Sequence, residues 1–155
     1  MLHFAYGANM HRDVMRRHAA AAQPIGAAAL ADHRFIITAD GYASVAPGLA
    51  HTVHGVLWRI TPRDRVTLDA WENVAGKLYG AKVLPVRHAG CLRPALVYMA
   101  RPLRIGRPKA GYMELVVAAA QAWHLPPDYM SSLQHWLPRR PTGAGSRKLG
   151  DIAWT

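Results

Sequence analysis

The amino-acid sequence predicts a single α+β domain, and three observations support that prediction. The chain has 155 residues, within the range of roughly 100 to 200 residues that one domain usually spans. Apolar residues make up 51% of the chain and charged residues 18%, a balance typical of globular rather than disordered proteins. Five segments have strand-like patterns and four have helical periodicity, which indicates both kinds of secondary structure.

Short apolar runs and alternating patterns predict the strands. The expected strands are Leu2–Tyr6, His33–Thr38, His51–Ile60, Leu78–Val86 and Pro94–Met99. Turns are expected at Asp40-Gly41 and at Pro47-Gly48, because glycine and proline favour turn conformations.

Helices are predicted from apolar spacing and from capping residues. A pattern that begins at Met10 is expected to end near Pro24, with the Ala-rich residues 19–31 as a helix end and connection. Thr61, followed by Pro62, predicts the start of a helix that runs to about Trp71. The other two expected helices are Tyr112–Trp123 and a short one between Asp128 and Pro138.

We expect residues 1–138 to form the domain and residues 139–155 to form a flexible basic tail, because few apolar residues occur in the tail before Ile152. No segment approaches the ~20 apolar residues of a membrane helix, and the apolar start of the chain is too short for a signal peptide. A single Cys91 excludes an intramolecular disulfide and a multi-cysteine zinc site. We therefore expect a cytoplasmic monomer or homodimer without a membrane partner.

The formal net charge of +10 invites comparison with nucleic-acid-binding proteins. Basic residues concentrate towards the C-terminus, and they lack the interleaved aromatic residues of a base-stacking surface. This distribution argues against nucleic acid as a partner. The alternative of a nucleic-acid binder would require salt-sensitive association through Arg139, Arg140, Arg147 and Lys148. The histidines are too scattered to suggest metal ligands, and no nucleotide or flavin motif occurs, so no metal or cofactor is expected.

Two local arrangements carry polar chemistry. In the first, Tyr6-Gly7-Ala8-Asn9, a glycine turn leads from a strand into a helix that Asn9 is expected to cap. A helix start presents unpaired backbone N–H groups, which suit a carboxylate or a developing oxyanion. In the second, Glu72 follows Trp71 and precedes an apolar segment. Desolvation there would raise the carboxyl pKa towards the range of a proton shuttle, although a glutamate at a helix end is more often solvated.

Together these segments resemble the gamma-glutamylcyclotransferase family (AIG2-like superfamily). That family has a Tyr-Gly-Ser-Asn turn and a Leu-Asp-x-x-Glu-Gly-Val segment followed by a tyrosine. The corresponding residues here are Tyr6 to Asn9, Leu68 to Val74, and Tyr79. The resemblance continues through residues 54–58, Tyr98, the spacing from Pro108 to Tyr112, and residues 125–129, and covers roughly residues 2–137.

The sequence departs from the family pattern at two positions. Ala8 replaces serine, which matters little if that position acts through its backbone N–H. Asn73 replaces the glycine after the glutamate, and asparagine tolerates the left-handed conformation that can end a helix.

The resemblance implies a small, mixed, partly closed β-barrel with surrounding helices. It also implies release of 5-oxoproline from a gamma-glutamyl compound, with Glu72 as both base and acid and no cofactor. Substrate contacts would come from Tyr6, Gly7, Ala8, Asn9, Tyr79, Tyr98 and Tyr112. Two alternatives stay open: a cyclotransferase specific for glutathione or for gamma-glutamyl amines, and an inactive module that only binds gamma-glutamyl compounds.

Overall fold

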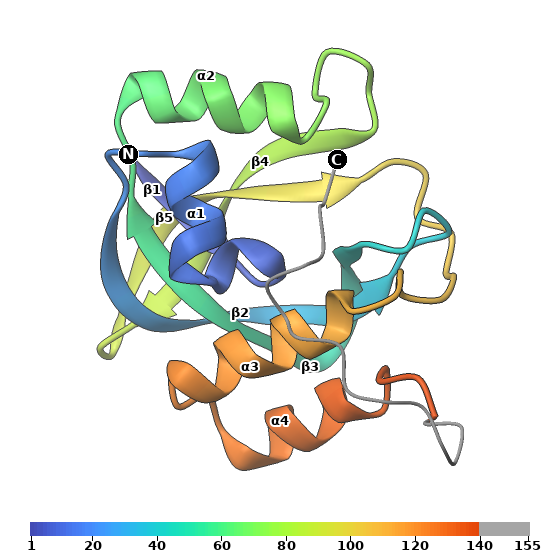
Figure 1. Ribbon diagram of the computed structural model, residues 1–155. Helices are drawn as coiled ribbons and strands as arrows, with labels where there is room; N and C mark the ends of the chain where they lie inside the picture. Colours follow the sequence, from blue (N-terminus) through green and yellow to red (C-terminus); the bar gives the residue numbers. More distant parts are fainter. Residues whose placement is uncertain (140–155) are drawn as a thin grey trace.

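Five strands form a closed barrel in the order β1-β3-β2-β4-β5, and four α-helices and a 3-10 helix accompany it in the computed structural model (Figure 1). The structure describes residues 1–139. The strands are β1 (Leu2–Ala5), β2 (Gln23–Ile37), β3 (Ala43–Arg59), β4 (Tyr79–His88) and β5 (Cys91–Ala100). The helices are η1 (Ala8–Met10), α1 (Arg12–His18), α2 (Pro62–Trp71), α3 (Tyr112–Ala122) and α4 (Pro127–Gln134).

The strand pairing is mixed, as expected. β1 runs antiparallel to β3, with Phe4 opposite Leu57, and its parallel pairing with β5 through His3 and Leu96 closes the barrel. β2 is antiparallel to both β3 and β4, and β4 is antiparallel to β5. The predicted α+β fold, a mixed β-barrel with helices packed on it, is therefore confirmed, and the barrel is closed where partial closure was expected.

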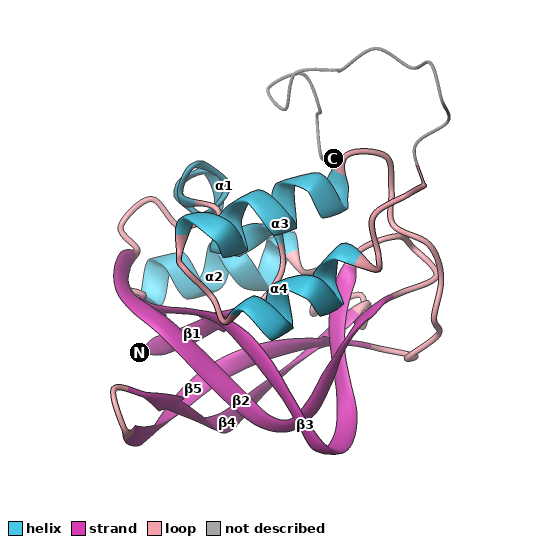
Figure 2. Cartoon of the chain, turned by 90° about the horizontal axis from the view of Figure 1, so that it is seen from below, coloured by secondary structure: helices cyan, strands magenta, loops and turns pink. Residues whose placement is uncertain are grey.

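The helices gather on one side of the strands, as Figure 2 shows. Their apolar faces join the barrel in one core that includes Phe4, Leu57, Leu68 and Met113, all of which are fully buried. α2 begins as the sequence predicts: Thr61 and Asp64 exchange side-chain and backbone hydrogen bonds in a capping box, and Pro62 occupies the first turn.

The Ala-rich residues 19–31 were wrongly predicted as a helix end and connection, because most of them belong to β2. Gln23 to Ala31 pair with Thr52 to Arg59 of β3, and Ala28 and Leu30 turn into the core. The intrinsic helix preference of alanine is small, at most about 1 kcal/mol per residue. Pairing with a long neighbouring strand outweighs it, and Pro24 and Gly26 weaken any helix here.

Two further local predictions were also wrong. Pro47-Gly48 lies within β3 instead of forming a turn. The helix expected from Met10 to Pro24 is divided into η1 and the seven-residue α1, which ends at His18. The turn at Asp40-Gly41 is confirmed, since the Gly41 N–H donates to the Thr38 carbonyl at 2.9 Å.

None of the helices between residues 1 and 139 is long and apolar enough to cross a membrane. In the same residues, no three His, Cys, Asp or Glu side chains come together as a metal site. The predicted basic tail, apart from Arg139, lies outside the described residues.

Candidate active site

A cavity of about 260 Å³ opens where β1 ends. Its walls come from β1 and the following turn, α1, the end of α2, the β2–β3 turn, β4, β5 and the start of α3. All the predicted site residues line this one cavity: Tyr6, Gly7, Ala8, Asn9, Glu72, Tyr79, Tyr98 and Tyr112. They come from five separate parts of the chain, so the fold brings together what the sequence separates.

The turn after β1 is built around a close approach between Gly7 and Tyr112. A Cβ atom on Gly7 would lie 2.7 Å from the Tyr112 hydroxyl oxygen, which is too short for a carbon–oxygen contact. The Tyr112 hydroxyl accepts hydrogen bonds from the backbone N–H groups of Ala43 at 3.2 Å and Ala8 at 3.4 Å. Glycine at position 7 therefore lets Tyr112 hold the turn against the β2–β3 hairpin.

Asn9 does not cap a helix, contrary to the prediction. The cap of α1 is His11, whose Nδ1 accepts from the Asp13 N–H at 3.3 Å. The Asn9 side chain is buried, and its Nδ2 lies 3.4 Å from Oε1 of Glu72. A primary amide can donate to a carboxylate and, after rotation, accept from a carboxylic acid. Asn9 can therefore bond to Glu72 in either protonation state.

Glu72 occupies the C-terminal cap of α2, where a local motif holds it. The Val74 N–H donates to the Asp69 carbonyl at 3.0 Å and the Asn73 N–H to the Ala70 carbonyl at 3.1 Å, the bonding pattern of a Schellman motif. Asn73 adopts a left-handed conformation with φ of 50°, so asparagine at this position preserves the helix end. The motif directs Glu72 into the cavity.

Burial raises the pKa of Glu72 from 4.5 to about 7, because the surrounding walls remove water that would stabilise the charged form. A carboxyl group with such a pKa exchanges protons readily near neutral pH. Glu72 is half-buried and lines the cavity, which distinguishes it from a freely solvated glutamate at a helix end. Burial also raises the pKa of Tyr6, Tyr79, Tyr98 and Tyr112, so these phenols stay protonated.

The tyrosine hydroxyls are committed to protein acceptors. Tyr98 donates to the Asp69 carboxylate at 2.6 Å, and the Nε of Arg65 in turn donates to Asp69 at 2.8 Å. Tyr79 donates to the Ala43 carbonyl at 2.9 Å and Tyr6 to the Tyr98 carbonyl. Since their protons are used in this way, these three oxygens present lone pairs, and their rings present apolar walls.

Comparison with known proteins identifies the family. A family model described as the AIG2-like family matches residues 52–133, more than half of the chain. The chain belongs to the AIG2-like family. The matched residues of this AIG2-like protein run from the second half of β3 to α4 and include Glu72, Tyr79, Tyr98 and Tyr112.

Solved structures share the fold of this AIG2-like chain. A structure titled gamma-glutamyl cyclotransferase superposes with a TM-score of 0.85 at 22% identity, covering 97% of this chain and 96% of the other. An uncharacterized protein from Homo sapiens gives a TM-score of 0.84 at 22% identity, with 97% and 95% covered. The YkqA protein of Bacillus subtilis gives 0.77 at 23% identity, with 87% and 53% covered. No curated protein matches the sequence.

Several residues that line the cavity were not anticipated from the sequence. His3 is buried on β1, with its Nδ1 at 3.1 Å from the Leu96 carbonyl and its ring edge-on to Tyr98. Tyr42 comes from the β2–β3 turn. Arg17 and His18 come from α1, and His18 stacks on Trp71. No local motif marks these residues, since each reaches the cavity only through strand pairing or helix packing.

The buried His3 and the half-buried Glu72 predict opposite pH dependences of stability in this AIG2-like protein. Burial lowers the pKa of His3 from 6.5 to about 4, so stability is lost as the pH falls through that interval. The pKa of Glu72 is raised to about 7, so its contribution is fully present below pH 4.5 and lost as the pH rises to 7. Each contribution is on the order of 3 kcal/mol. The two offset one another between pH 4.5 and 6.5, where both groups titrate in one of the two states.

Single substitutions are expected to separate these two contributions. Relative to the native protein, Glu72→Gln should gain free energy of unfolding as the pH rises from 4.5 to 7, and His3→Phe should gain it as the pH falls from 6.5 to 4. Urea unfolding at several pH values measures both differences. A pH-independent difference for either variant would show that the native side chain is not desolvated.

Proposed function

We propose that this protein is a gamma-glutamyl cyclotransferase that releases 5-oxoproline from a gamma-glutamyl amide. The observation that carries the proposal is the position of Glu72, which lines the cavity with its Oε1 3.4 Å from Nδ2 of Asn9 in the turn after β1. Its carboxyl group has a pKa of about 7. Intramolecular cyclisation requires a group that takes a proton and returns it, and one such carboxyl is sufficient.

The cavity can hold the gamma-glutamyl group by its polar and apolar parts. The phenol oxygens of Tyr6, Tyr79 and Tyr98 keep lone pairs after donating their protons, and these can accept from the substrate ammonium. The rings of the same residues enclose the methylene chain and exclude water. Such enclosure favours the folded substrate conformer, in which the α-amine lies against the δ-carbonyl.

The reaction forms one bond and breaks another. After the α-ammonium loses one proton to solvent, the α-nitrogen attacks the δ-carbon, and the Glu72 carboxylate takes the second proton. Collapse of the tetrahedral intermediate breaks the bond to the leaving nitrogen, and the Glu72 carboxylic acid returns its proton to that nitrogen. The products are 5-oxoproline and the free amine, and no water is consumed.

Negative charge develops on the δ-carbonyl oxygen when the α-nitrogen attacks, and this charge needs a hydrogen-bond donor. The Ala8 N–H is our candidate, because its bond to Tyr112 is long, at 3.4 Å. A substrate oxygen at a shorter distance would replace that bond without exposing the N–H. Oxyanion donors of this kind typically lower the barrier by about 3 to 4 kcal/mol. Because this donor is a backbone group, alanine in place of the usual serine is compatible with the role.

The test of this function is release of 5-oxoproline by the native protein. A suitable panel is gamma-glutamyl-alanine, Nε-(gamma-glutamyl)lysine and glutathione, with the free amine measured in parallel. We expect equal amounts of 5-oxoproline and amine from at least one compound, and the preferred compound identifies the leaving group. Binding by calorimetry without release would identify an inactive gamma-glutamyl-binding module. The absence of both binding and release would contradict the proposal.

The remaining expectations stay predictions. The partner of this site would be a small gamma-glutamyl compound rather than nucleic acid, in a cytoplasmic monomer or homodimer. The nucleic-acid alternative depends on basic residues of which only Arg139 belongs to the described part of the chain.

A further inference from the structure

We infer that Arg17 selects leaving amines that carry a carboxylate, so that gamma-glutamyl amino acids are preferred over gamma-glutamyl derivatives of uncharged amines. This inference rests on the proposed function and concerns the mouth of the same cavity. It assigns a specificity-determining role to a residue outside the turn and the glutamate segment.

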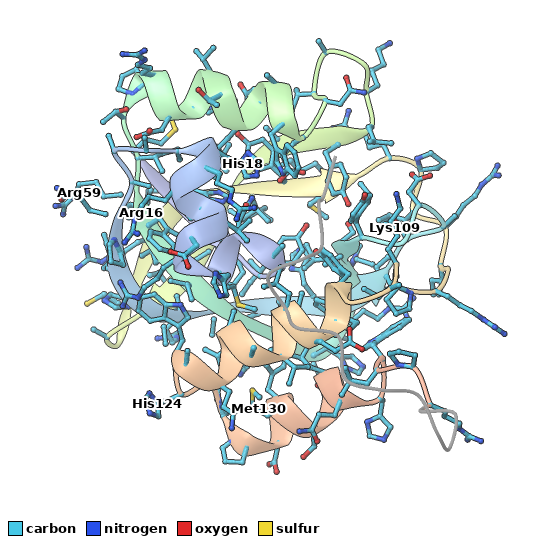
Figure 3. All side chains as sticks on the ribbon, in the orientation of Figure 1. Arg16, His18, Arg59, Lys109, His124 and Met130 are labelled. Carbon is cyan, nitrogen blue, oxygen red and sulfur yellow. The ribbon has the colours of Figure 1, made fainter. Side chains whose placement is uncertain are left out.

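The exposed residues that line the cavity are Arg17, Trp71 and Leu78, so its mouth lies beside the ends of α1 and α2. Arg17 and His18 belong to the last turn of α1, and Trp71 is the last residue of α2; all three line the cavity. The rings of His18 and Trp71 stack with their centroids 3.7 Å apart and their planes 21° apart. Figure 3 shows His18 on the side of α1 that faces α2, and Arg16 on another side. The stack thus joins both helix ends into one rim.

The charge on this rim is uncompensated in the described residues. Arg16, the neighbour of Arg17 in α1, pairs with Asp13 at 3.4 Å. Within residues 1–139, Arg17 has no acidic partner, and it is the one Lys or Arg side chain that lines the cavity. Burial and the charge of Arg17 lower the pKa of His18, so the stacked imidazole adds little charge at neutral pH. An anion at the rim would therefore meet a guanidinium without another partner.

The position of the leaving group follows from the role of Glu72. The leaving nitrogen must lie next to Glu72 to receive its proton, and Glu72 directly follows Trp71 of the rim. In an amino-acid leaving group, the carboxylate is attached to the carbon that bears this nitrogen. This carboxylate can therefore reach the rim beside Glu72, where the guanidinium of Arg17 can form charge-assisted hydrogen bonds with it. The stacked rings offer a flat surface for the amino-acid side chain.

Two substrates that differ only in this group test the inference: gamma-glutamyl-alanine and gamma-glutamyl-isopropylamide, in which a smaller, uncharged methyl group replaces the carboxylate. We expect the native protein to prefer the alanine compound by about tenfold in kcat/KM, the lower part of the range for a charged hydrogen bond because Arg17 is exposed. In Arg17→Met this preference should disappear, mainly through a higher KM for gamma-glutamyl-alanine. Arg16→Met is the matched control, since it removes the same charge from the same helix outside the cavity, and the preference should persist.

The outcomes separate this inference from the proposed function. Release of 5-oxoproline from both compounds without a preference, or a preference that survives Arg17→Met, overturns the role of Arg17 and leaves the function intact. An equal loss of the preference in Arg16→Met also overturns this role, because the general positive charge of the surface would then be responsible for the preference. If neither compound is turned over but glutathione or Nε-(gamma-glutamyl)lysine releases 5-oxoproline, the proposed function stands and the role of Arg17 is overturned. If no compound of the panel is turned over either, the proposed function fails, and calorimetric binding of both compounds to the native protein and the two variants decides the role of Arg17 by the same comparison.

Discussion

Glu72→Gln is expected to lower kcat for 5-oxoproline release by roughly a thousandfold. Glutamine has nearly the same size as glutamate and can still bond to Asn9, which lies 3.4 Å from Oε1 in the native protein. It cannot take the proton of the attacking amine or return one to the leaving amine. Because shape is retained and proton transfer is lost, KM should change much less than kcat.

The measurement is steady-state release of 5-oxoproline from the best substrate of the panel, with binding followed by calorimetry. Asp128→Asn is the matched control: it neutralises an exposed carboxylate in the first turn of α4, away from the residues that line the cavity. We expect this control to retain native kcat. Native activity in Glu72→Gln would transfer the acid–base role to another group and contradict the mechanism.

Gly55→Ala is expected to lower the free energy of unfolding by about 3 kcal/mol or more. A Cβ atom at position 55 would lie 2.2 Å from the Ala5 carbonyl oxygen and 2.9 Å from the ring of Phe4. The first of these neighbours is backbone, and β1 is held between β3 and β5 in the closed barrel. β1 would therefore have to move, and with it the turn that begins at Tyr6.

Urea unfolding measures this loss, and kcat for 5-oxoproline release measures the displacement of the turn. Gly90→Ala is the control, because a Cβ atom there meets no atom within 4 Å, although its φ of +79° is unfavourable for alanine. That variant should lose about 1 kcal/mol, the usual cost of a left-handed conformation. Equal losses in the two variants would mean that the barrel accommodates the methyl group at position 55 without moving β1.

The elements predicted most accurately are those with strong local signals. For α2, the sequence shows a capping threonine, a proline in the first turn and an asparagine two residues after the last one, and the helix runs from Pro62 to Trp71 as expected. Each signal acts through groups only a few residues apart. The end of this helix also places Glu72, so the most important site residue could be located from the sequence.

Predictions failed where pairing between distant segments outweighs local preference. Alanine favours helices, yet Ala27 to Ala31 lie in β2, because β3 supplies hydrogen bonds along the whole segment. The same limitation applies to Asn9: its position before α1 suggests a cap, but Glu72, distant in sequence, is its side-chain partner. A partner 63 residues away leaves no local signal.

The sequence by itself identified eight of the residues that line the candidate site, and it determined where the helix that carries Glu72 ends. It also determined the left-handed position of Asn73, because that conformation depends on the residue and its immediate neighbours. Only the tertiary structure decided the chemistry of these groups. The pKa of Glu72 depends on walls from several elements that remove water, and the Tyr98 hydroxyl is committed to Asp69 by the packing of β5 beside α2. Desolvation and hydrogen bonding are properties of surroundings in space, and the fold assembles those surroundings from distant parts of the chain.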